Sequence, residues 1–362
     1  MAFERVRVYH FRNLADATVE TNTRDVFLVG ENGQGKTNFL EAIYFTCYGS
    51  SFRTRRDDTL IRHGENDLAV EAVARRAEET HRVVIKQVGR KKSFELNGKV
   101  ITDRKDIVSN IPCIVFCHDD IGFVTGAPET QRWFMNQTLS LVDRDYLDVL
   151  RLYNRVLRSR NAALKSGRLE LLDTLDQQLV EAGIPVMIRR HEIAGRFSLL
   201  LSQLFATVFA GDLDLKLIYR PSWRSETPNQ EVRSRRENDI RMSTTTSGPH
   251  RDRFIYRYGE SLLTDVASTG QLRLVSLILR VAQAQFVTDA TGEKPVLLLD
   301  DVLLELDPAR RARFVNALPD YEQAFFTFLP DEQYARFRSD STCTYHVSAG
   351  TLSARRSQSA ES

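Results

Sequence analysis

The sequence predicts an α/β fold divided by an inserted α-helical lobe, and three observations predict it. Short apolar runs typical of buried strands lie near both ends of the chain, at DVFLV (25–29) and PVLLLDDV (295–302). Between them, residues 128–210 have helical apolar spacing with one internal proline. A glycine-rich turn also joins an apolar run to a helical pattern within residues 27–45.

Composition sets the outer limits. The 362 residues are 42% hydrophobic and 27% charged, enough for two domains or for one large domain with an insertion. Net charge is only +2, so a polyanion-binding surface must come from local clustering. Four cysteines without framework spacing indicate a reducing compartment, and no secretory leader or long apolar run is evident. We therefore expect a cytoplasmic protein without a membrane segment.

The individual elements follow in order. Strands are predicted at RVRVYHF and DVFLV, and the helix after the glycine turn should end before Gly49. Short strands follow up to Val100, with a hairpin turn at Asn97-Gly98, and then a buried strand at IPCIVFC (111–117). Beyond the helical lobe we expect strands at 213–220 and 253–258, an exposed loop at 225–239 and a helix at 271–286.

These elements define the expected domains. Residues 1–127 and 243–352 should form one discontinuous α/β domain, and residues 128–242 should form the inserted, mainly helical lobe. The tail, 353–362, has almost nothing to bury and should be disordered.

The sequence GENGQGKT (30–37) satisfies G-x-x-x-x-G-K-[ST] in full, between a strand and a helix, which predicts a P-loop NTPase fold. Glycines let the backbone N–H groups turn inward around phosphates, and the next helix adds its positive N-terminal end. Lys36 should reach the β- and γ-phosphates of ATP, and the Thr37 hydroxyl should ligate Mg²⁺. The expected ATP-binding residues of the loop are Gly30, Glu31, Asn32, Gly33, Gln34, Gly35, Lys36 and Thr37.

Two adjacent carboxylates end the apolar run VLLLDD. Asp300 is the expected second metal residue, because such a loop needs a carboxylate at the end of a buried strand to hold the cation. Asp301 then stands where a general base or water-orienting carboxylate is needed, so Asp301 and Lys36 are the expected catalytic residues. A solvent-facing strand end is the alternative interpretation of Asp301.

Asp300 lies far from Thr37 in sequence, which indicates the insertion, and STGQ (268–271) precedes the acidic strand. STGQ has the pattern of a helix start with free N–H groups. In ATPases of the ABC and SMC type a similar signature touches the γ-phosphate held by the other protomer. ELD (305–307) stands where that class places a dimer-contact loop. By this likeness the α/β domain is an ABC/SMC-type head, and Ser268 and Gly270 are further ATP-binding residues.

Several motifs in order make the likeness more specific, and the chain resembles the RecF family of bacterial DNA replication and repair proteins. The carrying segments are FRNL (11–14), GENGQGKTNFLEAIY (30–44), SFRT (51–54), LNGK (96–99), TGAPETQRWFMNQ (125–137), SGPHRDRF (247–254), ASTGQLR (267–273) and LLLDDVLLELD (297–307). The chain departs from the family pattern at Arg253, Leu272 and Leu304, where an aspartate, a polar residue and a serine are usual. These departures bear on dimer contacts and turnover.

The resemblance implies an ATP-dependent homodimer that binds single- and double-stranded DNA at gaps and acts with RecR and RecO in loading RecA. It also implies a weak, Mg²⁺-dependent, DNA-stimulated ATPase that serves as a release switch in DNA replication, repair and the SOS response. Residues 151–168 contain six basic side chains and no acidic one. Candidate DNA contacts are Arg151, Arg155 and Arg158 there, and Arg53, Arg55 and Arg56 after the loop helix.

Other interpretations stay open at this point. The basic helix face could simply be solvated. A small-molecule kinase also combines a phosphate loop with a helical insertion, but it would not need STGQ or ELD. The ATPase subunit of a transporter usually has a shorter chain and a histidine after the next strand, where AFFTF (324–328) has Thr327.

Overall fold

The computed structural model describes residues 2–76, 79–103, 105, 111–209, 215–224, 226–303, 306–331 and 334–354. Its internal contacts divide the chain into two compact units. The first unit is Met1–His118, Val287–Ala312 and Leu318–Ser362, and the second is Asp119–Phe286 with Arg313–Ala317. Each unit is described by itself.

The first unit contains a mainly parallel six-stranded sheet in the order β15-β14-β3-β13-β12-β8. Only β15 runs antiparallel to its neighbour. Every residue of β3, β8, β12 and β13 is buried, as expected for strands covered on both faces. The strands are β3 (Asp25–Val29), β8 (Cys113–Phe116), β12 (Val296–Leu299), β13 (Gln323–Phe328), β14 (Thr342–Ser348) and β15 (Thr351–Ala354).

The second sheet of this unit is antiparallel, in the order β2-β1-β4-β5-β6-β7. Its predicted hairpin is confirmed, since Asn97 and Gly98 have φ of 52° and 77° and join β6 to β7. The strands are β1 (Ala2–Tyr9), β2 (Ala17–Glu20), β4 (Asp67–Arg76), β5 (Glu79–Val88), β6 (Lys91–Leu96) and β7 (Lys99–Ile101).

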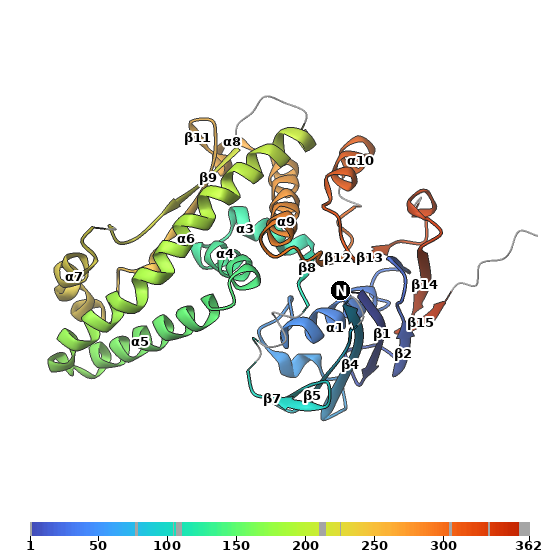
Figure 1. Cartoon of the computed structure of the whole chain (residues 1–362), viewed down its shortest axis with the longest axis horizontal. Helices are drawn as coiled ribbons and strands as arrows, with labels where there is room; N and C mark the ends of the chain where they lie inside the picture. Colours follow the sequence, from blue (N-terminus) through green and yellow to red (C-terminus); the bar gives the residue numbers. More distant parts are fainter. Residues whose placement is uncertain are drawn as a thin grey trace, which may run out of the picture. The chain divides into compact units, whose positions relative to one another are not determined.

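Helix α1 (Lys36–Tyr48) has the predicted bounds and ends at Gly49, whose φ of 63° suits glycine. It contacts β4 and β5 of one sheet and β8 and β13 of the other (Figure 1). Because α1 is enclosed in this way, its buried residues lie on all sides rather than on one stripe. Shorter elements of the unit are η1 (Asp57–Leu60) and η5 (Tyr334–Phe337).

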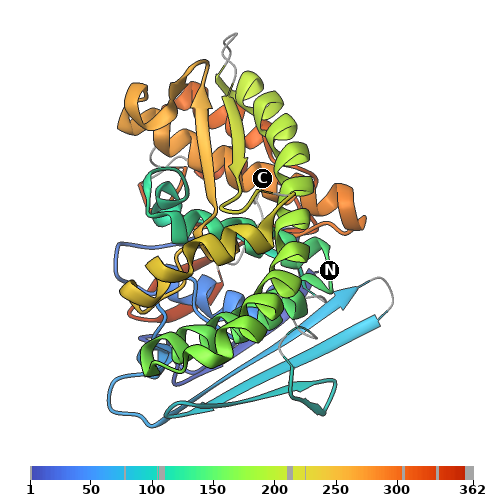
Figure 2. The ribbon, with the colours of Figure 1, turned by 90° about the vertical axis from the view of Figure 1, so that its left-hand side faces the viewer.

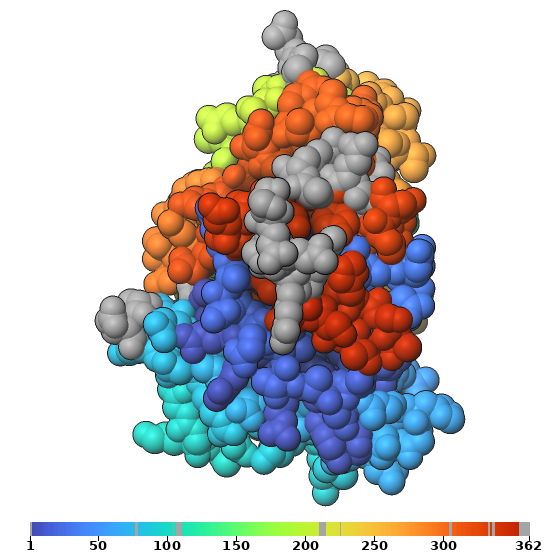
Figure 3. All heavy atoms as spheres, turned by 90° about the vertical axis from the view of Figure 1, so that its right-hand side faces the viewer, coloured from blue at the N-terminus to red at the C-terminus, as the bar shows by residue number. Residues whose placement is uncertain are grey.

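The two ends of the described chain meet in the first unit. β14 pairs in parallel with β3, placing Cys343 beside Val26, and Figure 3 shows the N-terminal and C-terminal segments side by side on one face. β15 includes Ser353 and Ala354, two residues that the sequence analysis assigned to a disordered tail. The remainder of that predicted tail, 355–362, lies outside the described residues.

The second unit combines helices with a three-stranded antiparallel sheet, β11-β10-β9. Its long helices α5 and α6 pack against each other (Figure 2). The elements are η2 (His118–Ile121), α3 (Gly122–Thr125), α4 (Pro128–Val142), α5 (Tyr146–Ser166), η3 (Leu169–Leu171), α6 (Leu172–Phe209), β9 (Leu215–Arg220), α7 (Pro228–Met242), η4 (Pro249–Arg251), β10 (Arg253–Tyr258), β11 (Ser261–Leu262), α8 (Leu263–Val266) and α9 (Thr269–Thr291), which runs on into the first unit; α10 (Pro308–Ala317) also spans the boundary.

The prediction of an exposed loop at 225–239 was wrong. Most of that segment is helix α7, which starts with Pro228 at a position where proline is favoured. Its apolar pattern is weak, and the helix is held by long-range contacts: Val232 is buried, and buried Asp239 accepts a 2.8 Å bond from Arg160 of α5. Such contacts override local polarity.

The compact units differ from the expected domain boundaries at 127/128 and 242/243. β10 pairs with β9, so the chain after residue 243 stays with the helical unit. Arg280 of α9 also bonds the buried Asp120, at 2.8 Å. The second unit therefore includes most of α9, a grouping set by strand pairing and a buried ion pair that local sequence patterns do not reveal.

Among the described residues, one helical stretch, Leu169–Phe209, is long and apolar enough by composition to cross a membrane. Buried core helices meet the same criterion. α6 carries the buried Arg190, which pairs with Asp252 at 2.8 Å inside the second unit. A single helix of this kind is weak evidence for a membrane span.

Candidate nucleotide-binding site

The phosphate loop joins β3 to α1, and glycine is required at different positions of the loop for different structural reasons. Gly33 and Gly35 have φ of 77° and 118°, in the region that favours glycine. A Cβ on Gly30 would lie 2.3 Å from the carbonyl oxygen of Val347, so no larger residue fits there. The loop is thus shaped by glycine both through backbone conformation and through close packing.

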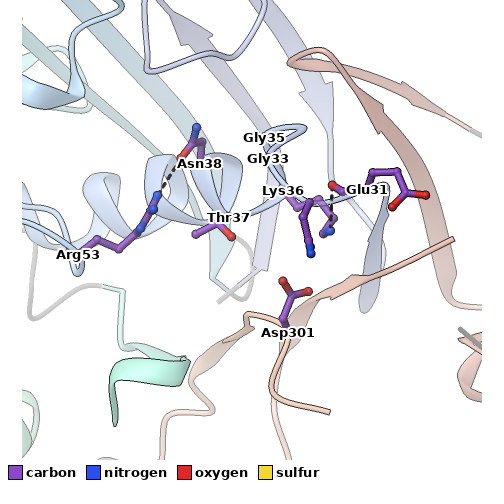
Figure 4. A pocket seen from close by; sticks show the side chains of 9 residues that line it. Glu31, Gly33, Gly35, Lys36, Thr37, Asn38, Arg53 and Asp301 are labelled. Atoms are coloured by element: carbon purple, nitrogen blue, oxygen red, sulfur yellow. Dashed lines mark hydrogen bonds between the residues drawn. The ribbon is translucent and has the colours of Figure 1, made fainter. Parts of the chain in front are cut away.

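The loop lines a cavity of about 200 Å³ in the first unit. Figure 4 shows Asp301 with its carboxylate facing the loop at Lys36. The lining residues are Glu31, Asn32, Gly33, Gly35, Lys36, Thr37, Asn38, Arg53 and Asp301. Of the described loop residues, Gly30 and Gln34 are outside this lining.

Gln34 instead contacts the turn between β14 and β15. Its carbonyl accepts a 2.9 Å bond from Gly350 N–H, and its side-chain Oε1 accepts a 2.6 Å bond from Ala349 N–H. Asn13, which lies next to Gly350, donates to the Gly33 carbonyl at 3.1 Å. These contacts fix the loop backbone, so Gln34 is placed to support the loop and not to line its cavity.

Lys36 is only 4% exposed and folds back over the loop. Its ammonium donates to the carbonyl of Gly30 at 2.6 Å and to that of Glu31 at 3.3 Å. A buried cation that donates to neutral carbonyls is well suited to receive a phosphate oxyanion.

Asp300 and Thr37 meet at the end of β12. The Thr37 hydroxyl donates a 2.8 Å bond to Asp300 Oδ1. Burial raises the pKa of the Asp300 carboxyl to about 6, although the bond from Thr37 lowers it. A hydroxyl and a carboxylate oxygen at this separation are hard ligands of the type that Mg²⁺ prefers.

Arg53 was predicted among the DNA contacts, and the structure places it in the cavity lining. Its guanidinium donates to Asn38 at 2.9 Å and lies 3.7 Å from the fully buried carboxylate of Glu41. Arg53 also acts to lower the pKa of Asp300. Arg55 and Arg56, from the same segment, are exposed, and Arg56 pairs with Asp58.

Ser268 and Gly270 belong to the second unit and are exposed. The predicted helix start is confirmed, because α9 begins at Thr269. Ser268 Oγ accepts from Gln271 N–H at 3.3 Å, and Gln271 Oε1 accepts from Ser268 N–H at 2.8 Å. This reciprocal pair is a capping box.

The three predicted arginines of α5 are all exposed on the second unit. Arg151 pairs with Asp148 at 3.2 Å, whereas Arg155 and Arg158 form no ion pair within the part of the chain that the structure describes. These two therefore keep their charge available to a polyanion.

Comparison with known proteins places this geometry in a family. The sequence model of the RecF/RecN/SMC N-terminal domain matches residues 2–349. The DNA replication and repair protein RecF of Treponema pallidum is 43% identical over 346 residues, covering 94% of this chain and 98% of the relative. The chain belongs to the RecF family.

Further RecF proteins agree with this assignment. RecF of Leptospira interrogans is 31% identical over 333 residues, covering 90% of this chain and 91% of that protein. A solved recombination mediator protein RecF with ATP, of the RecFOR pathway, has 25% identity and a TM-score of 0.89, with 98% of each chain covered. An SMC head at 16% identity and a TM-score of 0.57 shares the fold. The predicted fold class, an ABC/SMC-type head with a helical lobe, is confirmed.

The three residues that depart from the RecF pattern differ in their burial and position in the fold. Arg253 is exposed at the start of β10, and Leu272 is half-buried in the first turn of α9. Leu304, like Glu305 of the predicted ELD contact, lies outside the described residues. Asn13 and Asn38 contact the phosphate loop or line its cavity but were not predicted, since isolated asparagines give no local signal.

Proposed function

We propose that this RecF-family chain is an ATP-dependent DNA-binding protein of replication and recombinational repair, in which slow hydrolysis acts as a release switch. The observation that carries the proposal is the meeting of Thr37 with Asp300 beside the phosphate loop. A loop of this kind joined to a buried carboxylate is suited to a nucleoside triphosphate with its cation.

The residues present fit ATP and Mg²⁺. The loop offers backbone N–H groups and the buried Lys36 ammonium to phosphate oxygens. Thr37 and Asp300 would hold Mg²⁺, which neutralises charge on the phosphates when bound. Asp301, at the cavity wall, would orient or deprotonate the attacking water. Solved RecF with ATP supports the nucleotide assignment.

Membership of the RecF family supports DNA and the proteins of the RecFOR pathway as the proposed partners of this chain. The relatives are named as DNA replication and repair proteins, and the solved RecF proteins belong to the RecFOR pathway. We assign to this chain binding at single-strand gaps, cooperation with RecR and RecO, and support of RecA loading in the cytoplasm. Arg155 and Arg158 supply exposed cations that could track a phosphate backbone without base readout.

ATP-dependent dimerisation is the remaining part of the proposal. The N-terminus of α9 exposes Ser268 and Gly270, so the positive end of this helix is open to an anion held by a second chain. In such a dimer Ser268 and Gly270 of one protomer would complete the phosphate site of the other.

Sedimentation velocity tests this function directly. The full chain with ATP, Mg²⁺ and a gapped duplex should sediment as a DNA-bound dimer, and without ATP as a monomer. Lys36→Met provides the control, since it should stay monomeric under all conditions. A monomer that ignores ATP, or phosphate transfer to a small molecule in place of release as inorganic phosphate, would contradict the proposal and favour a kinase.

A further inference from the structure

Two buried polar side chains, Gln323 and Thr327, lie in the otherwise apolar strand β13. Thr327 is 3% exposed and lies in the sequence QAFFTF, among buried phenylalanines. β13 runs between β3, which leads into the phosphate loop, and β12, which ends at Asp300. The hydroxyl therefore sits in the centre of the sheet, between the two strands that build the site.

The Thr327 hydroxyl forms two hydrogen bonds with Asp301. It accepts a 2.7 Å bond from the backbone N–H of Asp301, and it lies 2.8 Å from Asp301 Oδ1, to which it donates. Asp301 has φ of 53°, a left-handed conformation that aspartate adopts more readily than most residues when its polar side chain is hydrogen-bonded. The double contact holds both the backbone turn and the carboxylate of one residue.

The single hydroxyl proton also separates the roles of two carboxylates. Asp300 Oδ1 lies 3.3 Å from Thr327 Oγ1, farther than Asp301 Oδ1, and already accepts from Thr37. With its proton directed to Asp301, Thr327 leaves Asp300 to Thr37 and the cation. Asp301 is thereby held at the wall of the cavity (Figure 4).

We propose that Thr327 is a positioning residue for ATP hydrolysis, whose hydroxyl fixes the backbone and carboxylate of Asp301 toward the phosphate cavity. This inference rests on the proposed ATPase function. Thr327 acts through Asp301, so it should govern the rate of turnover and leave the affinity for ATP to the loop. A threonine chosen only to fill the strand would be replaceable by valine, its closest match in shape.

The test compares Thr327→Val with Thr327→Ser in the full chain. Valine should lower kcat by up to about 100-fold, the order of loss that a misplacement of about 1 Å can cause, with the Kd for ATP within about twofold of wild type. Serine keeps the hydroxyl and should restore kcat to within about threefold. Thr327→Cys, with a weak donor, should give an intermediate rate and serves if the valine variant folds poorly.

Thr344→Val is the matched control. Thr344 is buried on the parallel strand β14, and its hydroxyl has no partner among the described residues. Its replacement should leave kcat unchanged. An Asp301→Asn background adds a second readout: if Thr327 works through Asp301, Thr327→Val should cause no further loss there.

Unchanged kcat in Thr327→Val would overturn the inference, as would an equal loss in the serine variant or an additive loss on Asp301→Asn. A fall in ATP affinity that accounts for the whole loss would also overturn it, by showing a general structural role. Absence of any ATPase in the wild type would instead reject the proposed function itself, so the two failures are distinguishable.

Discussion

The Thr37 hydroxyl lies 2.8 Å from Asp300 Oδ1, although 263 positions separate the two residues. The contact exists because β3 and β12 flank β13 in one parallel sheet and end at the same edge. Most of the second unit lies between these two residues in sequence, and the two strands still lie in one sheet with β13 between them. The sheet therefore brings together Thr37 and Asp300, the two residues that we propose as metal ligands.

Asp300→Asn should make the nucleotide-free protein relatively more stable as pH rises. The folded pKa, about 6, is above the ordinary 3.8 because of burial. Between these values the unfolded chain has lost the proton and the folded chain keeps it, so the wild-type contribution to stability falls as pH rises toward 6. From about pH 4.5 to about pH 7.5 the variant should gain about 2 kcal/mol on the wild type.

Urea unfolding at both pH values measures this difference. The same variant should lose Mg²⁺-dependent ATP binding, which separates stability from function. Parallel stability curves for the two proteins would show that Asp300 does not titrate in this range.

Lys36→Met should weaken ATP binding by at least about 100-fold, because a methionine removes charge-assisted bonds worth about 1.5–3 kcal/mol each. Calorimetric titration with ATP measures the loss. Lys86→Met on β5 is the control, since Lys86 pairs with Glu95 on the antiparallel sheet and should bind ATP normally. Equal affinity in Lys36→Met and wild type would mean that the loop is not the nucleotide site.

The Arg53→Ala substitution should weaken ATP binding, and Arg55→Ala should leave ATP binding unchanged. Both arginines are exposed, but Arg53 lines the cavity with Asp301, whereas Arg55 is outside the cavity lining. Loss of one charged contact to a phosphate predicts about tenfold weaker ATP binding for Arg53→Ala. If ATP affinity stays normal and only DNA binding weakens, then the sequence-based assignment of Arg53 to a DNA surface is the correct one.

The double variant Arg155→Ala/Arg158→Ala should lower the salt dependence of DNA binding. Each lost phosphate contact reduces the slope of log K against log salt by about 0.9 on duplex DNA, so two contacts predict a change of about 2. Arg233→Ala/Arg235→Ala on α7 removes the same charge from other exposed positions and is the control. Identical slopes for the two double variants would remove α5 from the DNA surface.

Local sequence patterns predicted the elements whose start, end or turn is fixed by their own residues. Helix α1 was placed at its observed bounds because the glycine turn starts it and Gly49 ends it. The Asn97-Gly98 hairpin was equally clear, since only a few residues adopt its turn conformation. Helix α7 was missed because it packs against α5 and α6, and its buried Asp239 bonds Arg160, which lies far away in sequence.

The sequence by itself determined the phosphate loop, the acidic strand end and the family resemblance, because each depends on residue types at fixed short spacings. Only the tertiary structure decided that Arg53 lines the cavity, that Gln34 supports the loop from behind, and that Thr327 holds Asp301. These contacts depend on strand order and side-chain direction in a sheet whose neighbouring strands are far apart along the chain. Short-range spacing carries no information about them.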